Sequence, residues 1–184
     1  DDYYQSKSQT ESKKMDAVAE SLFGLYGDRQ ARSRMRQDGQ TVKMGFCARG
    51  MCIVTGESFP SFAESRTARA LIIEMARGDI DLQLLSTIQS KKDKLSYCMK
   101  GYIQYIIDNQ DKIQKNCKYK FMEYRNKANQ NLAHGRIPEI VASEYIGIEL
   151  FYEYAKEKGV ITEERMKQMK EDAWKILMKV AIKQ

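Results

Sequence analysis

Two short polar segments of this chain combine residue types that phosphate chemistry uses. The chain opens with Asp1 and Asp2, and paired carboxylates at the end of a strand can hold Mg²⁺ and orient an attacking water. Thr55 and Glu57 follow the apolar run 51–54, where a hydroxyl can bond a γ-phosphate or that water. Each segment also has a plainer interpretation. An acidic chain end commonly lies in solvent, and Thr-Gly-Glu is a common turn.

The segments that must position Thr55 and Glu57 have the hydrophobic pattern of strands. Residues 42–46 alternate between apolar and polar, which is typical of a half-buried strand. Residues 51–54 and 70–75 are short, nearly continuous apolar runs, as found in strands that are buried on both faces of a parallel sheet. Because ligands of such sheets gather at the carboxyl ends of the strands, Asp1, Asp2, Thr55 and Glu57 would face one crevice.

The predicted sheet is incomplete in this chain. Two buried strands cannot form a stable sheet by themselves, since parallel strands need neighbours and helices on both faces. Either the chain pairs its strands with another chain, or the rest of the sheet precedes Asp1. The chain has no initiator methionine, so we expect a piece of a longer protein.

The remaining segments have helical periodicity. Ser8 and Glu11 have the spacing of a capping box, and the apolar spacing after them predicts a helix that ends at Gly27. Five further helices are predicted after Gly78, the fourth beginning at Pro138 and the fifth capped by Thr162. We therefore predict an α/β fragment over residues 1–77 and a mainly α-helical bundle over residues 78–184, with helix predominating overall.

The composition indicates a globular protein. Hydrophobic residues make up 42% and charged residues 30% of the chain, with a mean hydropathy of −0.61, which excludes collagen and disordered polyelectrolytes. No apolar run approaches the ~20 residues that span a bilayer, so we predict a cytoplasmic protein without a membrane segment. Four cysteines without a C-x-x-C pair and the single His134 favour reduced thiols over a zinc site.

The net charge of +6 is consistent with nucleic-acid binding. A basic segment before the Asp38-Gly39 turn signal can contact DNA phosphates or be a solvated loop; the candidates are Arg29, Arg32, Arg34, Arg36 and, beyond the turn, Lys43. The helical half interleaves lysines with tyrosines that could stack on bases, although helical spacing assigns most of these rings to the core. They are Lys91, Lys92, Lys112, Lys115, Lys118 and Lys120, and Tyr97, Tyr102, Tyr105, Tyr119 and Tyr124.

Several motifs in order resemble the C-terminal half of phage- and plasmid-encoded primase–helicase-like P-loop ATPases, a family of mobile genetic elements. After Asp1-Asp2 and a helix come Gly-Asp-Arg and Arg-Ser-Arg-Met-Arg (27–36), Arg-Gly-Met-Cys-Ile-Val-Thr-Gly-Glu-Ser-Phe-Pro (49–60), Ser-Arg-Thr-Ala-Arg (65–69), Gly-Asp-Ile-Asp (78–81) and Gly-Tyr-Ile (101–103). The similarity covers residues 1–110 and is loose around His134 and Arg136, where a turn between helices is predicted.

The resemblance implies a partial RecA/AAA+-like parallel sheet joined to a helical domain. It places the Walker B role and a Mg²⁺ site on Asp1 and Asp2, a site that only the missing upstream half would complete. It places a sensor-1 role on Thr55, beside Glu57. It points to Arg69 as a trans-acting arginine, which would stabilise transition-state charge on a neighbour's γ-phosphate, with Arg66 as the second candidate. Arg69 is alternatively a salt-bridge partner.

The chain departs from the family in one respect. No G-x-x-x-x-G-K-[ST] motif occurs, so we expect the chain alone to be inactive and without cofactors, whereas the full-length protein would use ATP and Mg²⁺. The resemblance implies part of an ATP-dependent DNA helicase or replication ATPase that oligomerises with itself, binds single-stranded DNA and needs its N-terminal ATPase half. The alternatives are a non-catalytic helical DNA-binding or protein-interaction module, and a scaffold that pairs its strands with a partner.

Overall fold

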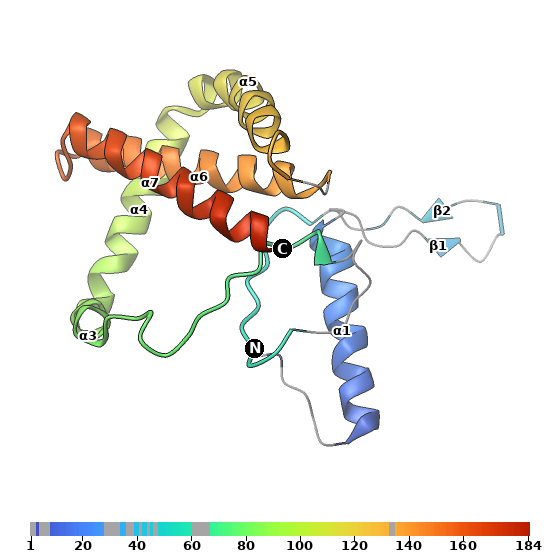
Figure 1. Ribbon diagram of the computed structural model, residues 1–184. Coiled ribbons are helices and arrows are strands. Elements are labelled where there is room, and N and C mark those ends of the chain that lie inside the picture. The colour runs from blue at the N-terminus through green and yellow to red at the C-terminus, as the bar shows by residue number, and fades with distance from the viewer. Residues whose placement is uncertain are drawn as a thin grey trace. The chain divides into compact units, whose positions relative to one another are not determined.

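The structure is a computed structural model that describes residues 3, 8–27, 34–35, 39–40, 42–43, 45, 48–59, 67–132 and 135–184 (Figure 1). It divides into two compact units, Asp1–Ala70 and Leu71–Gln184. Sequence reasoning places this boundary after residue 77. None of the helices in the described ranges is both long and apolar enough to cross a bilayer.

The first unit is organised around the helix α1 (Gln9–Gly27). This helix begins after Ser8, whose carbonyl accepts a hydrogen bond from the Ser12 amide at 3.0 Å, and it ends at Gly27, as predicted. Phe23 packs edge to face on Phe59, with ring centroids 5.8 Å apart. The buried Tyr3 donates its hydroxyl hydrogen bond to Asp16 Oδ1 at 2.5 Å. These contacts hold α1 against the chain on either side of it.

The predicted parallel sheet is wrong. Strands in the described part of the chain are limited to β1 (Arg34–Met35) and β2 (Val42–Lys43), which pair antiparallel. Residues 51–55 and 71–76 form no strand. One parallel bridge joins Tyr3 to Gly56, and the Tyr3 amide donates to the Thr55 carbonyl at 2.6 Å. The chain is therefore mainly helical and is not a partial RecA/AAA+-like α/β fragment.

The strand prediction for the apolar runs 51–54 and 70–75 is wrong because a central strand is stabilised by burial and not by hydrophobicity alone. Met51 is 70% exposed and Ile53 is 82% exposed, and in the second run Ile73 and Met75 are 66% and 63% exposed. A buried parallel strand needs paired neighbours on both sides and helices on both faces, and the described residues supply neither to these runs. An extended apolar segment without neighbours stays outside the core.

The second unit contains the five predicted helices. They are α3 (Leu82–Ser90), α4 (Lys92–Asp108), α5 (Gln110–Asn129), α6 (Ile137–Glu157) and α7 (Glu163–Lys183). Thr162 caps α7 as predicted, since its Oγ1 accepts a hydrogen bond from the Arg165 amide at 3.2 Å. Beyond the end of α6, Gly159 has a φ of 69°, the left-handed conformation that glycine adopts after a helix.

The core of the second unit lies where α6 packs against both α5 and α7 (Figure 1). Small side chains dominate its centre: Ala128, Val141 and Ala142 have no exposed surface, and Ala181 is 2% exposed. Small residues let helix backbones approach closely, so that dispersion contacts between the three helices are dense. The first two residues of α6 are also buried: Ile137 is 5% exposed, and Pro138 is among the largest fully buried side chains.

The helix α4 packs on α6 through one aromatic contact region. Tyr102 meets Phe151 edge to face at 5.4 Å between centroids, and Tyr105 lies 5.6 Å from the ring of Tyr154. Gly101 faces the Tyr154 hydroxyl so closely that a Cβ at this position would overlap it. A side chain at residue 101 would therefore force Tyr154 to shift from its place between α4 and α6.

We predict that Gly101→Ala and Gly147→Ala have opposite effects on stability. Alanine adds about 0.5–1 kcal/mol of helix propensity at either position. At Gly147, where nothing lies within 4 Å of the new Cβ, this gain should raise the melting temperature. At Gly101 the overlap with Tyr154 should cost about 1–3 kcal/mol and lower it. Thermal unfolding followed by circular dichroism measures both, and a Gly101→Ala variant as stable as Gly147→Ala would contradict the packing.

Candidate functional site

The residues predicted for nucleotide chemistry are described only in part. Asp1, Asp2 and Arg66 lie outside the described residues. Thr55 and Glu57 are exposed, and the Thr55 carbonyl is bonded to the amide of Tyr3, the residue that follows Asp2. The backbone contact in the described residues is that of Tyr3 with Thr55. The assignment of the predicted residues to Mg²⁺, water or phosphate stays a prediction.

The predicted arginine finger, Arg69, lies within a short turn at the end of the first unit, closed by the hydrogen bond from the Ala70 amide to the Thr67 carbonyl at 3.2 Å. Its aliphatic stem lies against Gly27 at the end of α1, where an added Cβ would be 2.7 Å from Arg69 Cδ. Its predicted role towards a phosphate is untested. Among the described residues, no group of three or more His, Cys, Asp or Glu side chains is arranged to hold a metal ion.

The predicted DNA-binding arginines are also described in part. Arg29, Arg32 and Arg36 lie outside the described residues, whereas Arg34 and Lys43 are opposite each other in the register of β1 and β2. Their contact with DNA stays a prediction. His134 is outside the described ranges as well, and Arg136 lies in a turn at the start of α6, as predicted.

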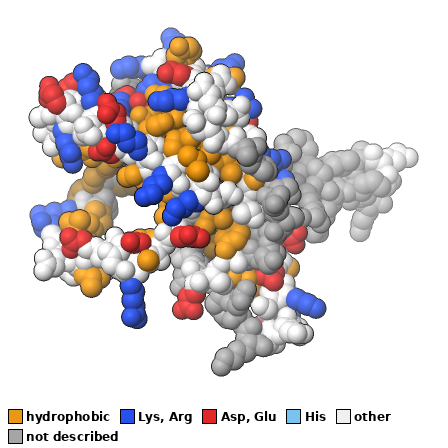
Figure 2. All heavy atoms as spheres, viewed as in Figure 1, with side chains coloured by type: hydrophobic (Ala, Val, Ile, Leu, Met, Phe, Trp, Pro, Cys, Tyr) orange, Lys and Arg blue, Asp and Glu red, His pale blue; other side chains and the backbone are white. Residues whose placement is uncertain are grey.

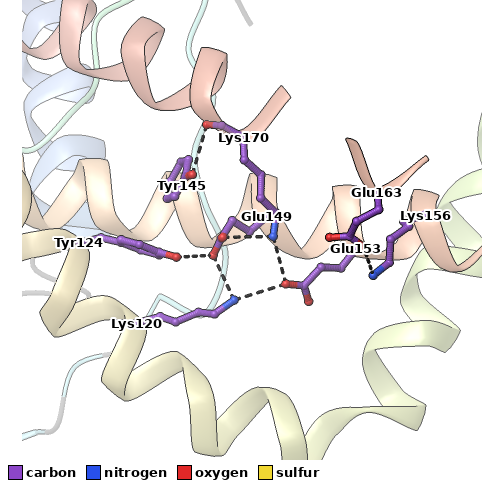
Figure 3. Close-up of polar contacts among 8 residues, drawn as sticks. All are labelled: Lys120, Tyr124, Tyr145, Glu149, Glu153, Lys156, Glu163 and Lys170. Carbon is purple, nitrogen blue, oxygen red and sulfur yellow. Dashed lines mark hydrogen bonds and ion pairs between the residues drawn. The ribbon is translucent and has the colours of Figure 1, made fainter. Parts of the chain in front are cut away.

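A partly buried polar network joins the three core helices of the second unit (Figure 3). At its centre is Glu149 of α6, which is 5% exposed. Its Oε2 accepts hydrogen bonds from Lys120 Nζ at 3.1 Å and from the Tyr124 hydroxyl at 2.8 Å, both on α5. Its Oε1 lies 3.2 Å from Lys170 Nζ on α7. One carboxylate therefore contacts both helices that flank α6.

Glu153, one turn further along α6, completes the network. Its Oε1 lies 3.4 Å from Lys120 Nζ and 3.3 Å from Lys170 Nζ, so two carboxylates and two ammonium groups alternate and their charges cancel. Tyr145 adds a further link to α7 by donating its hydroxyl hydrogen bond to the Lys170 carbonyl at 3.2 Å. Buried charges are tolerated in proteins when they are paired and hydrogen-bonded in this way.

The network shifts the titration of its members in directions that favour its charged pairs. Burial lowers the pKa of Lys120, but the hydrogen bond and charge of Glu149 outweigh it and the pKa is raised. Burial raises the pKa of Glu153, but Lys120 and Lys170 outweigh it and the pKa is lowered. Burial, followed by the charge of Glu149, raises the pKa of Tyr145 to about 12. At neutral pH Lys120 is therefore cationic, Glu153 is ionised and Tyr145 is protonated.

The chemistry available to this network is structural. A cavity of about 30 Å³ beside it, lined among others by Tyr105, Cys117, Lys120 and Glu153, has room for about one water molecule and none for an organic ligand. Sequence reasoning missed the network, although a signal existed: Lys120 and Tyr124, and likewise Glu149 and Glu153, are four residues apart within helices that otherwise show apolar periodicity.

The tyrosines that were candidates for base stacking divide into two groups. Tyr102, Tyr105 and Tyr124 take part in ring contacts with residues of α6, as helical spacing predicted. Tyr119 of α5 is 74% exposed and Tyr97 of α4 is 75% exposed. Only these two of the five tyrosines on α4 and α5 present their rings to solvent.

The basic residues of α5 divide in the same manner. Lys120 belongs to the network, Arg125 Nε lies 3.1 Å from Glu139 Oε1, and Lys127 Nζ lies 4.4 Å from the centroid of the Trp174 ring. Three exposed lysines remain that form no ion pair with any residue in the described ranges: Lys112, Lys115 and Lys118. Residues 91–129 carry ten Lys and Arg against four Asp and Glu, a formal net charge of +6.

We predict that Glu149→Ala strongly destabilises the protein. Removing this carboxylate leaves Lys120 and Lys170 with a single shared carboxylate, that of Glu153. Breaking a buried pair typically lowers the free energy of unfolding by about 3–5 kcal/mol. The control is Glu157→Ala on the same helix. Among the described residues its carboxylate pairs with Lys158 alone, at 3.5 Å, and both side chains are 52% exposed, so the cost should stay below about 1 kcal/mol. Urea unfolding measures both. Equal costs would contradict a central role for Glu149.

We predict a loss of stability in alkali that depends on Tyr145. Its pKa is about 12 in the folded protein and 10.0 ordinarily, so the unfolded state releases this proton first. The contribution is fully present below pH 10 and disappears as the pH rises towards 12. In Tyr145→Phe the urea midpoint should be lower at neutral pH, because a hydrogen bond is lost, and should fall less steeply above pH 10. Tyr119→Phe should keep the wild-type slope, and an unchanged slope in Tyr145→Phe would contradict the assignment.

Comparison with known proteins finds no matching family model, no matching curated protein and no matching solved structure.

Proposed function

We propose that the helical unit Leu71–Gln184 is a non-catalytic module that binds single-stranded DNA, with α5 as its principal contact. The observation that carries this proposal is the exposed ring of Tyr119, which lies among lysines that have no ion pair with any described residue. Lysines attract the phosphate backbone, and an exposed aromatic ring can stack on an unpaired base. Both chemical components of a single-strand site are therefore present on one helix.

The helical repeat places the components on one stripe of α5. Lys112, Lys115 and Tyr119 are spaced by three and four residues, so they lie on one face over a length of about 10 Å. Lys118 flanks this stripe, and Met122, which is 46% exposed, extends its apolar part. Figure 2 shows basic side chains along the edge of the molecule where α5 lies. We call Lys112, Lys115, Lys118 and Tyr119 the α5 stripe.

A single strand suits the α5 stripe better than a duplex. In a duplex the bases are stacked on one another, and a flat aromatic ring on a helix surface has no base face to contact. In a single strand each base offers its face, and stacking on aromatic side chains is tolerant of sequence. The lysines contribute attraction that is independent of sequence and sensitive to salt. A second tyrosine, Tyr97 between Lys94 and Lys100 on α4, has the same surroundings.

The alternative of an ATPase fragment receives less support from the geometry. It requires strands whose carboxyl ends form a nucleotide crevice, and the described residues around Thr55 form a single bridge instead of a sheet. Binding of DNA by the α5 stripe needs no part of that sheet. It depends only on helices that pack together within the second unit.

We predict that Tyr119→Ala weakens binding to single-stranded DNA by about 5- to 100-fold, the usual contribution of one stacked base. Tyr119→Phe should keep the affinity, because stacking needs the ring and not the hydroxyl. The measurement is fluorescence anisotropy of a labelled oligothymidylate of about 20 nucleotides, longer than a typical site of 4–16. Failure of the wild-type protein to bind in low salt, or equal affinity of wild type and Tyr119→Ala, would contradict the proposal.

The lysines are tested by the salt dependence of the same binding. Lys115→Gln/Lys118→Gln should make the slope of log K against log salt shallower by about 1.4, because each phosphate contact on a single strand contributes about 0.7. The matched control is Lys175→Gln/Lys179→Gln, which removes two exposed lysines of α7 and should leave the slope unchanged. A duplex bound as tightly as the single strand, with no effect of Tyr119→Ala, would indicate a merely electrostatic surface and would contradict the proposal.

A further inference from the structure

The helix α4 carries an apolar row that no described residue covers. Leu95, Met99, Ile103 and Ile107 follow one another at intervals of four residues, and they are 53%, 54%, 52% and 57% exposed. This spacing keeps the four side chains on neighbouring positions of one helix face. The row, which we call the α4 row, is about 18 Å long. Large apolar side chains are normally exposed singly, and a contiguous group marks an interaction surface.

The α4 row is distinct from the face by which α4 packs in its own unit. That face carries Tyr102 and Tyr105, which contact Phe151 and Tyr154 of α6. In Figure 1, α3 and the N-terminal half of α4 extend away from α5, α6 and α7. None of the residues of α3 is buried. Figure 2 shows hydrophobic side chains on the surface of this projecting part.

We propose that the α4 row is a self-association surface, on which α4 of a second copy of this chain packs in antiparallel orientation. A two-fold axis through the middle of the row brings Leu95 opposite Ile107 of the second copy and Met99 opposite Ile103. Each contact then occurs twice, as an isologous interface requires. The four side chains are apolar, similar in length and evenly spaced about the axis. The row on one copy can therefore pack against the reversed row on the second copy.

The charges at the two ends of α4 specify the antiparallel orientation. The N-terminal end of α4 is net basic, with Lys91, Lys92 and Lys94 against one acid, Asp93. Two aspartates lie at and beyond its C-terminal end, Asp108 and Asp111, before the next lysine, Lys112. The lysines and Asp108 oppose the helix dipole of an isolated α4, because cations are unfavourable at an N-terminus and anions at a C-terminus. Antiparallel packing brings the basic end of each α4 beside the acidic end of the other. Parallel packing would bring like charges together.

The exposed area indicates the strength of this association. Leu84 and Ile88 of the adjoining α3 are 57% and 43% exposed, and with the α4 row they present on the order of 600 Å² of apolar surface per copy, which is the upper end for a monomer. Two such surfaces bury about 1,200 Å², the lower limit of a specific interface. The expected product is a reversible dimer with a dissociation constant in the micromolar range.

Sedimentation velocity over a range of protein concentrations tests this proposal. The wild-type chain should shift from monomer to dimer, and Met99→Glu should weaken the dimer by about 100-fold or more, because a charge would be buried without a partner. The matched control is Tyr97→Glu, the same change at a side chain that is 75% exposed on another face of α4, which should dimerise as the wild type does. A wild-type chain that stays monomeric, or a Met99→Glu chain that dimerises normally, would overturn the proposal.

The orientation is tested by disulfide formation in a chain whose four native cysteines are replaced by serine. A mixture of the Leu95→Cys and Ile107→Cys proteins should form a mixed disulfide, because these positions are opposite each other in the antiparallel pair. Neither protein should cross-link with itself, since copies of one position are then about 18 Å apart along the helix, beyond the reach of a disulfide. Self-cross-linking of each variant, with no mixed product, would overturn the antiparallel arrangement.

Discussion

Burial of the Glu149 carboxylate is the constraint on which the second unit depends. An acidic side chain that is 5% exposed is tolerated only when opposite charges and hydrogen-bond donors surround it. Those partners come from two other helices, Lys120 and Tyr124 from α5 and Lys170 from α7. The three helices must therefore adopt a rotation and an axial position that bring these partners to the Glu149 carboxylate.

This constraint also decides which side chains remain for contact with other molecules. Because Lys120 and Tyr124 face Glu149, the opposite side of α5 presents Lys115 and Tyr119 to solvent. In the same way, the contact of Tyr102 and Tyr105 with α6 leaves the α4 row uncovered. The proposed DNA contact and the proposed dimer contact are thus the outward faces of helices whose inward faces form the core.

Local signals predicted the helices well and the sheet poorly, for one physical reason. A helix closes its hydrogen bonds within its own segment, so caps such as Thr162 and breaks such as Gly159 mark it in the sequence. A strand needs a partner that can lie anywhere in the chain or outside it. The apolar run 51–54 has strand composition, yet in the described structure its neighbourhood contributes one bridge at Gly56. The Walker B, sensor and arginine-finger assignments depended on that sheet and stay untested.

The sequence by itself determined the helical class of residues 78–184, the end of α1, the start of α6 and the cap of α7. It also determined the excess of positive charge on residues 91–129. These features follow from neighbours along the chain. Only the tertiary structure decided which of several residues of the same type are buried in the core and which are exposed. Tyr119 and Tyr124 lie on the same helix among similar lysines, but the first is exposed and the second bonds Glu149. This difference in exposure comes from α6, which is distant in sequence. The Glu149 carboxylate of α6 accepts hydrogen bonds from the side of α5 that carries Tyr124, and Tyr119 lies on another side.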